Sequence, residues 1–193
     1  MPSEPTILAF DTSAAHCAAA LLMGGRILAE RLEEMGKGQA ERLFPMLEEV
    51  LAQADAAWSD LDAVAVGTGP GNFTGIRIAV SAARGLSLSL GIPAIGVDGF
   101  DVVREVAGLS TVALPAPRGQ VYLKDFTHGG APILAEAEAA ERPLPLNGNP
   151  AGIIARLAAR RLSVSTDIPR PAPLYIRPAD AAPASDPPPV ILP

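Results

Sequence analysis

The segment GTGPGNFTGIR, at residues 67–77, combines four glycines with hydroxyl and amide side chains directly after an apolar run. A glycine-rich turn between a strand and a helix often binds phosphate, because the helix N-terminus carries partial positive charge. The spacing fits neither the P-loop nor the GxGxxG dinucleotide fingerprint. Gly69, Gly71, Thr74 and Gly75 therefore remain candidates for close approach of the backbone to an anion or to another part of the protein. We favour the second interpretation, a rigid structural turn.

A second candidate for phosphate chemistry follows the first apolar run, where Asp11, Thr12 and Ser13 stand in a row. An aspartate beside hydroxyls at the end of a first strand is how actin- and hexokinase-like ATPases begin their first phosphate-binding hairpin. The alternative is an Asx turn that ends a strand. Residues 14–16, Ala-Ala-His, place neither a glycine nor a cation next to a phosphate. This favours the turn, or a site that has decayed.

Other catalytic chemistry has few residues to draw on. The two histidines, His16 and His128, are far apart in the sequence, and no GxSxG nucleophile elbow is present. Neither histidine stands at metal-ligand spacing, so each is interpreted as a surface or satisfied polar residue. Cys17 is the single cysteine, which excludes an internal disulfide and fits a reducing compartment. We interpret Cys17 as a small buried apolar residue.

Composition limits the function classes further. The 193 residues include 15 basic and 21 acidic side chains, and the formal net charge is -6. Neutralisation of phosphate supplies most nucleic-acid affinity, so an acidic protein is a poor candidate for binding nucleic acid without a partner. The N-terminus lacks the positive charge of a signal peptide, and no apolar run approaches the roughly 20 residues that cross a bilayer. We expect a cytoplasmic protein that does not enter the membrane.

The candidate residues must be positioned by a mixed sheet covered with helices. Apolar runs predict strands at residues 6–10, 17–23, 26–34, 61–66, 92–97, 111–115 and 120–126. Helical spacing of apolar residues predicts helices at 40–54, 75–90, 99–108 and 153–162. The first helix is expected to start between Ala40 and Leu43, so that Pro45 falls in its first turn. Thr74 is the expected N-cap of the second helix.

The helix at residues 75–90 has an unusual surface. A broad apolar side can pack on the sheet, and Arg77, Ser81 and Arg84 form a narrow polar strip beside it. Ser81, Gly85 and Ser89 follow one another at intervals of four, a low ridge that would let another helix approach closely. A helix that faces solvent would carry a wide charged side. We therefore expect burial on two sides, either within the domain or against another molecule.

Four stretches resemble the bacterial TsaB (YeaZ) family: ILAFDTSAAHCAAALL, AERLFPML, the block from Asp62 to Val97, and PLYIRP. The paralogous TsaD enzymes share the strand, GPG loop and helix. The resemblance implies an α/β, actin-like (ASKHA, ribonuclease-H-like) fold in two lobes with a reduced C-terminal lobe. It divides the chain into an N-terminal ribonuclease-H-like, partner-binding lobe at 1–108, a shortened C-terminal lobe at 109–176 and a Pro-rich tail at 177–193.

The resemblance also implies a role in installing threonylcarbamoyl on the tRNA adenosine beside the anticodon. In that system TsaD is the transferase, TsaE is an ATPase, and TsaB is a non-catalytic subunit that pairs with TsaD through its first two helices. The implied partner surface is Phe44, Leu47, Leu51, Ile78, Ser81, Ala82, Gly85 and Ser89. The implied vestigial phosphate-binding turn is Asp11, Thr12, Ser13, Gly69, Gly71, Thr74 and Gly75. We expect a TsaD heterodimer, TsaE bound through that heterodimer, tRNA contacted only indirectly, and a homodimer when the chain is alone.

A comparison with TsaD bears on enzymatic activity. TsaD-like enzymes carry an HxxxH metal pair just after the strand that ends in Gly-Val, and here Gly99 and Val103 occupy those positions. Because neither can bind a metal, we expect an inactive paralogue with no catalytic residue, no metal and no cofactor, ATP included. The alternative is an ATP-binding enzyme of the actin/hexokinase superfamily that uses Asp11, Thr12 and the glycine-rich loop. A metallopeptidase is disfavoured, because paired histidines are absent.

Overall fold

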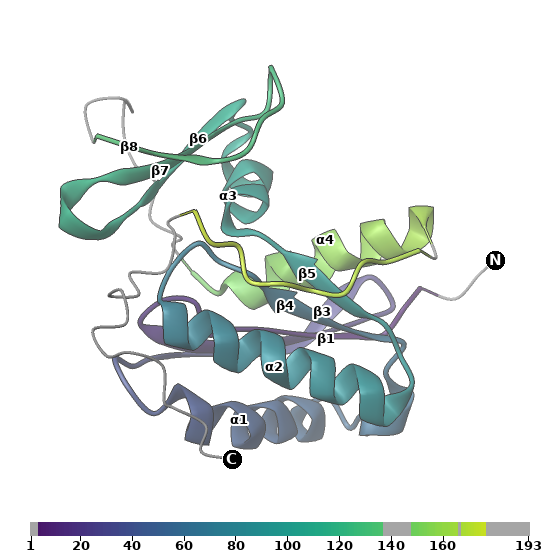
Figure 1. The fold of residues 1–193 in the computed structure, drawn as a ribbon. Helices are drawn as coiled ribbons and strands as arrows, with labels where there is room; N and C mark the ends of the chain where they lie inside the picture. The colour runs from purple at the N-terminus through teal and green to yellow at the C-terminus, as the bar shows by residue number, and fades with distance from the viewer. Residues whose placement is uncertain (1–3, 137–147, 166, 177–193) are drawn as a thin grey trace, which may run out of the picture.

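The computed structural model describes residues 4–136, 148–165 and 167–176, which form a five-stranded sheet with helices on both faces and a smaller three-stranded sheet (Figure 1). The strands are β1 (Ile7–Asp11), β2 (His16–Met23), β3 (Arg26–Glu34), β4 (Ala63–Gly67), β5 (Ala94–Val97), β6 (Thr111–Pro115), β7 (Val121–Asp125) and β8 (Ile133–Ala135). The α-helices are α1 (Gln39–Gln53), α2 (Phe73–Leu90), α3 (Gly99–Ala107) and α4 (Pro150–Val164). No helix within these described ranges is long and apolar enough to cross a membrane.

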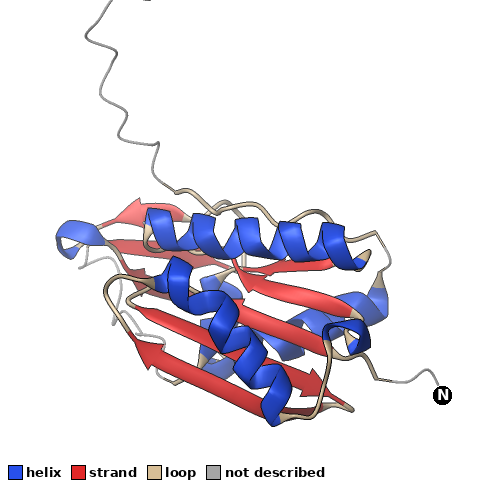
Figure 2. Ribbon diagram, turned by 90° about the horizontal axis from the view of Figure 1, so that it is seen from below, coloured by secondary structure: helices blue, strands red, loops and turns tan. Residues whose placement is uncertain are grey.

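The larger sheet has the strand order β3-β2-β1-β4-β5. Strands β1, β2 and β3 form the expected antiparallel meander, and β4 and β5 extend the sheet in parallel with β1. Helices α1 and α2 lie side by side on one face (Figure 2), and α4 covers the other. Because both faces are covered, every residue of β1 and β4 is buried.

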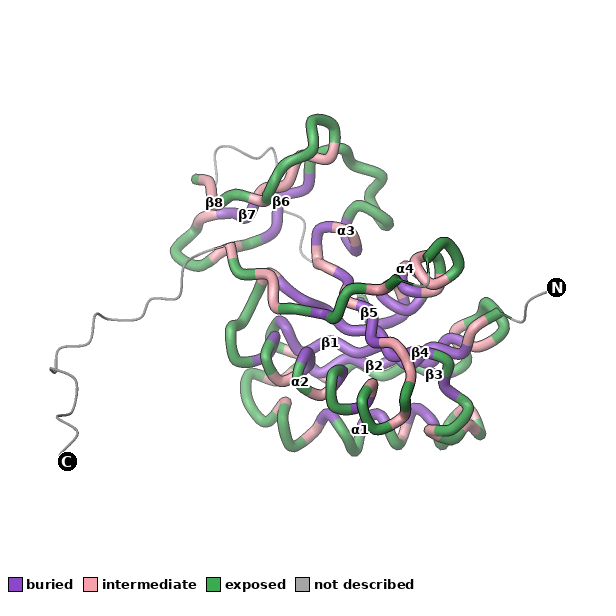
Figure 3. The backbone as a smooth tube through the Cα atoms, turned by 45° about the vertical axis from the view of Figure 1, so that its right-hand side comes forward, coloured by how far each residue is buried: buried purple, intermediate pink, exposed green. Residues whose placement is uncertain are grey.

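Alternate residues of the central strands point to the two helical layers. Leu8, Phe10 and Val66 face α1 and α2 and join one apolar core with side chains such as Leu47 and Ile76. Each fully buried side chain of this size stabilises the fold by roughly 2 kcal/mol. This core fixes the inner sides of α1 and α2 and leaves their outer sides exposed, as the green outer turns of Figure 3 show.

The opposite face of the larger sheet is built mostly from alanine. Ala9 and Ala20 on the strands meet Ala151 and Ala155 on α4, all with no exposed surface, so the helix can approach the sheet closely. Helix α4 therefore belongs to the larger sheet. The predicted boundary after residue 108 is wrong in this respect, because it assigned α4 to the second lobe.

The smaller sheet, of order β6-β7-β8, is antiparallel and packs against α3. The apolar core between this sheet and α3 is small, and its buried side chains are Phe100, Val103, Val112, Leu114 and Tyr122. An ion pair between Lys124 Nζ and Asp98 Oδ2, 2.8 Å apart, ties this sheet to the start of α3. The second unit is thus a small appendage to the larger one.

The structure corrects the expected starts of both outer helices. Helix α1 begins at Gln39, so Pro45 is its seventh residue and lies beyond the first turn, where it removes one intrahelical hydrogen bond. Helix α2 begins at Phe73, and its N-cap is Asn72, whose side chain accepts a hydrogen bond from Gly75 N at 2.9 Å. Thr74 is therefore inside the helix rather than its cap, because Asn72 caps at least as well as threonine and stands one helical turn before Gly75.

Residues 167–176, which we call the strap, run in extended form from the end of α4 towards the start of α2 (yellow in Figure 1). Leu174 N donates a hydrogen bond to Thr68 O at 2.8 Å, and Pro171 is buried. Pro171 thus joins the packed part of the molecule. Residues 177–193, the expected Pro-rich tail, lie outside the described residues.

Candidate functional site

The two segments that could have held phosphate are hydrogen-bonded to each other. Thr12 Oγ1 donates to Gly75 O at 2.7 Å, and Asn72 N donates to Ser13 O at 2.6 Å. Thr12 has no exposed surface, and Ser13 is 8% exposed. The turn after β1 and the start of α2 thus lie in direct hydrogen-bond contact. We call this contact the closed junction.

Three glycines allow the closed junction to form. A Cβ atom on Gly67 would lie 2.0 Å from Asp11 Oδ1, and one on Gly75 would lie 1.9 Å from Thr12 O. A Cβ on Gly71 would lie 2.1 Å from the carbonyl oxygen of Ser13. Such distances are below any van der Waals contact, so only glycine fits at these positions. These glycines allow one chain segment to lie directly against another.

Asp11 is 2% exposed, and its carboxylate is used within the turn. Oδ1 accepts a hydrogen bond from Ser13 N at 3.2 Å, and Oδ2 accepts one from Ser13 Oγ at 3.0 Å. His16 Nε2 lies 2.7 Å from the same Oδ2 atom. The interpretation of His16 as a satisfied polar residue is confirmed, and His128, whose side chain is 83% exposed, lies at the surface.

The positions that a metal pair would occupy are structural in this chain. Gly99 N donates a hydrogen bond to Gly69 O at 2.8 Å, and Val103 is buried in the core of the second unit. Within the described ranges, no group of three or more His, Cys, Asp or Glu side chains is arranged to hold a metal ion. Gly69 adopts a left-handed φ of 90° in the loop between β4 and α2.

The outer sides of α1 and α2 form the second candidate site. A Cβ atom on Gly85 would meet nothing within 4 Å, and Ser81 and Ser89 are exposed. Phe44 on α1 is 44% exposed, an unusual position for a large aromatic side chain. We define the helix face as Phe44, Ile78, Ser81, Ala82, Gly85 and Ser89.

Two residues of the predicted partner surface are not on it. Leu47 is 0% exposed and Leu51 is 3% exposed, and both pack into the core beneath α1. They share the helical spacing of Leu43 and Val50, which marks one inward stripe. That spacing already assigned them to the core, so including them in the contact surface was wrong. They support the helix face from beneath.

Helix α1 is held at the sheet edge by a charged network. Arg42 Nε donates to Glu33 Oε2 on β3 at 2.8 Å, and Arg42 Nη1 donates to Glu49 Oε1 at 2.8 Å. The hydrogen bonds from Arg42 lower the pKa of both carboxyl groups. Nearby, burial raises the pKa of the Cys17 thiol to about 11, in agreement with its interpretation as an inert apolar residue.

Sequence reasoning missed the contact between α2 and the strap. Arg77 Nε donates to Tyr175 Oη at 2.9 Å, and its guanidinium carbon lies 3.8 Å from the centre of the Phe73 ring. Arg84 Nε donates to Pro171 O at 2.8 Å. The polar strip of α2 therefore binds the strap. The only signal in the sequence was the family-like PLYIRP stretch, about 100 residues away from the helix.

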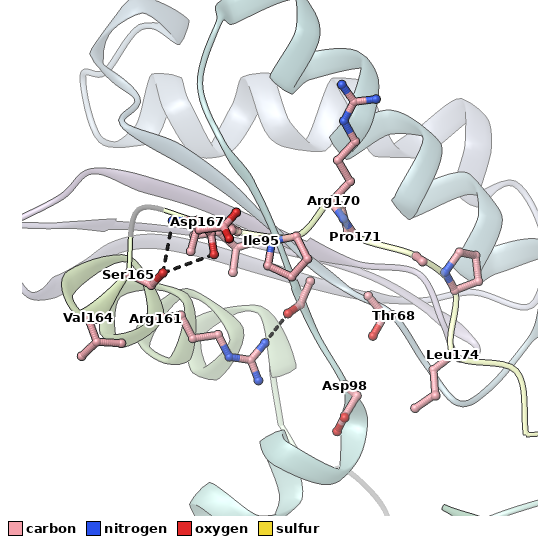
Figure 4. Close-up of a pocket in the computed structure, with 15 residues that line it drawn as sticks. Thr68, Ile95, Asp98, Arg161, Val164, Ser165, Asp167, Arg170, Pro171 and Leu174 are labelled. Carbon is pink, nitrogen blue, oxygen red and sulfur yellow. Dashed lines mark hydrogen bonds between the residues drawn. The ribbon is translucent and has the colours of Figure 1, made fainter. Parts of the chain in front are cut away.

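Between α4, β5 and the strap lies a pocket of about 560 Å³ (Figure 4). Its polar lining includes Thr68, Asp98 and Arg161, and the rest is mainly aliphatic and proline side chains. Arg161 contacts Gly96 O and Asp101, and Asp98 pairs with a lysine and caps α3. Asp98 and Arg161 are thus engaged in holding the fold, and two further charged residues, Asp167 and Arg170, also line the pocket. No motif in the sequence indicated this pocket.

Comparisons with known proteins agree with this architecture. A family model described as "TsaD: tRNA N6-adenosine threonylcarbamoyltransferase" matches residues 32–177. A protein of Buchnera aphidicola named tRNA threonylcarbamoyladenosine biosynthesis protein TsaB is 34% identical over 147 residues, which cover 73% of this chain and 69% of the relative. The chain belongs to the TsaB family. The family lies within the wider group that the TsaD model describes.

Two further relatives define how far the TsaB likeness extends. The Bacillus subtilis protein of the same name is 37% identical over 121 residues, which cover 61% of this chain and 53% of that relative. The solved structure of YeaZ from Pseudomonas aeruginosa matches with a TM-score of 0.74 and 27% identity, covering 89% of this chain and 99% of that one. The expected actin-like α/β fold is confirmed by the family model and by this structural likeness.

Proposed function

We propose that this TsaB-family chain is a non-catalytic subunit that pairs with a TsaD-type transferase in tRNA threonylcarbamoyladenosine biosynthesis. The process comes from the names of its relatives. The observation that carries the non-catalytic role is the closed junction, in which Thr12 and Ser13 are hydrogen-bonded to the backbone that leads into α2. A phosphate could enter only if these bonds were broken.

The cost of opening the closed junction can be estimated. Each buried hydrogen bond that is lost leaves a donor or an acceptor unpaired, at about 1–3 kcal/mol per group. The bonds of Thr12 to Gly75 O and of Asn72 to Ser13 O would both be lost. ATP would have to offset this cost before any net binding appeared. The site therefore favours a structural role over nucleotide hydrolysis.

The helix face supports the pairing role. Gly85 is open to solvent in the middle of an 18-residue helix, where alanine would be more stable by about 1 kcal/mol. A glycine at such a position is explained by the close approach of another helix. In this proposal TsaD provides that helix, TsaE binds to the resulting heterodimer, and the free chain forms a homodimer through the same face.

The proposal is tested by reconstitution with TsaD and TsaE from the same organism. We expect the chain to co-purify with TsaD, and tRNA threonylcarbamoylation, measured by nucleoside analysis, to require it. The chain alone should give no heat of binding with ATP and magnesium in calorimetry. Full tRNA modification without the chain would overturn the pairing role, and micromolar ATP binding by the isolated chain would overturn the non-catalytic role.

A further inference from the structure

Three arginines along α2 and the strap have no carboxylate within ion-pair distance among the described residues. They are Arg77, Arg84 and Arg170, and all are exposed. Most other arginines of the two helical layers are paired with acids, as Arg42 is with Glu33. We call these three residues the arginine seam. In a chain of net charge -6, a run of cations without acidic partners indicates a surface that meets an anion.

The positions of the three side chains form one continuous seam. Arg77 and Arg84 are separated by two turns of α2, about 10.5 Å along the helix axis. Each donates through Nε to the strap, to Tyr175 and to Pro171 respectively. Arg84 and Arg170 also line one hollow of about 700 Å³ beside the C-terminal end of α2.

No acidic side chain on α2 accompanies this seam. Residues 63–97 contain no aspartate or glutamate, so α2 carries its arginines without any carboxylate of its own. Arg170 lines the same pocket as Asp98 and Asp167 but forms no ion pair with either of them. Figure 4 shows Arg170 pointing away from Asp98 and Arg161. The positive charge of the seam is therefore not cancelled by these neighbours.

Exposed aromatic rings stand at one end of the seam. Phe73 is 42% exposed and Tyr175 is 45% exposed, with ring centres 5.1 Å apart. Arg77 lies over the Phe73 ring and donates to the Tyr175 hydroxyl, which fixes all three side chains in place. Exposed rings beside arginines are the groups on which unpaired nucleic-acid bases stack.

We propose that the arginine seam contacts RNA, with Arg84 and Arg170 at phosphodiester groups and an unpaired base on the Phe73–Tyr175 pair. This inference rests on the proposed function, because tRNA is the substrate of that complex. It goes beyond the expectation that tRNA is contacted only through the partner. The overall acidity of the chain is compatible with it, since the seam adds to RNA affinity that TsaD supplies and need not hold the tRNA alone.

The test measures tRNA binding by the complex of this chain with TsaD, using fluorescence anisotropy of a labelled tRNA transcript at several salt concentrations. Arg170→Glu is the probe, because the Arg170 side chain has no hydrogen-bond or ion-pair partner among the described residues. We expect affinity to fall about tenfold and the slope of log affinity against log salt to shrink by about one. Arg26→Glu, the same charge change at the exposed start of β3, is the matched control and should leave both quantities unchanged.

A second variant tests the stacking end of the seam. Tyr175→Leu removes the ring and the hydrogen bond to Arg77, and we expect a further loss of about fivefold in tRNA affinity. Equal loss with Arg170→Glu and Arg26→Glu would mean a general charge effect and would overturn the proposal. No loss with either seam variant would also overturn it.

Two further measurements distinguish RNA from the other ligands that could bind the seam, namely free phosphate and a protein partner. If AMP or inorganic phosphate binds the chain at millimolar concentration through Arg170 while tRNA affinity is unchanged, the seam holds free phosphate and not RNA. If Arg170→Glu instead weakens binding of TsaD or TsaE, the seam is a protein contact. Heterodimer formation is measured separately by sedimentation, so a failure of the pairing role is distinguished from a failure of the seam.

Discussion

The glycines at the start of α2 and the glycine farther along the same helix have different surroundings. At the closed junction, Gly71 and Gly75 lie against the backbone of the turn after β1, and a single added carbon atom would collide with a carbonyl oxygen. On the helix face, Gly85 has open space in every direction in which a side chain would extend. Gly71 and Gly75 are needed for a contact within the chain. No contact within the chain requires a glycine at position 85.

This difference indicates where the function of the molecule lies. The segments that resemble a phosphate-binding site are filled by their own hydrogen bonds, while the exposed groups gather on the outer side of the same helix. This contrast supports the proposal that the outer side of α2 is a surface for another macromolecule. The comparison predicts opposite effects of the same substitution at the two positions.

The largest effect is expected from Gly75→Ala. The new methyl group would lie 1.9 Å from Thr12 O, so the turn and the helix must separate. Overpacking of this kind costs typically 1–3 kcal/mol, and we expect a loss of about 3 kcal/mol in the free energy of unfolding. Urea unfolding followed by circular dichroism would measure it. Gly85→Ala is the matched control, and it should raise the free energy of unfolding by about 0.5–1 kcal/mol.

If Gly75→Ala and Gly85→Ala had equal effects, the contrast between the closed junction and the helix face would be lost. A stable Gly75→Ala protein would mean that the junction opens without cost. In that case a ligand could enter between the turn and the loop, and the argument against nucleotide binding would fail.

A smaller effect is expected from Arg42→Met, which removes the charged link between α1 and β3 but keeps an aliphatic stem. The pKa values of Glu33 and Glu49 are lowered by Arg42, so their contribution to stability is present above the ordinary value of 4.5 and is lost as pH falls below it. We expect Arg42→Met to lower the melting temperature at pH 7 by about 2 °C, because the side chains of these ion pairs are partly exposed to solvent.

The pH dependence provides the control for this variant. The difference in melting temperature between Arg42→Met and the original chain should shrink as the pH is lowered from 6 towards 3, since protonated glutamates no longer bind Arg42 strongly. A difference that stayed constant with pH would show that packing of the Arg42 stem, and not its charge, holds α1 to β3.

Much of the fold could be predicted from local pattern. The strands β1 to β4 and the helices follow from apolar runs and helical spacing, which act over a few residues. The expected helix starts at Thr74 and near Pro45 were wrong by a few residues, because several residues near each helix start can serve as its end. The exclusion of Leu47 from the surface was also available from its spacing.

The rest depended on contacts that no local pattern contains. Arg77 and Arg84 looked like a simple polar strip, and only the folded chain shows that they bind residues of the strap that follow about 90 to 100 positions later. The closed junction likewise joins segments about 60 residues apart. A glycine's spacing shows that a close approach occurs, but not whether the approaching group is a phosphate or a carbonyl oxygen.

The central claim is that the helix face binds TsaD, and its most direct test compares Gly85→Arg with Gly85→Ala. Both variants should fold, because nothing lies within 4 Å of a Cβ atom added at this exposed position. In sedimentation velocity with TsaD, we expect Gly85→Ala to associate within about threefold of the original affinity and Gly85→Arg to lose about a hundredfold or more. Association of a folded Gly85→Arg protein at the original affinity would contradict the claim.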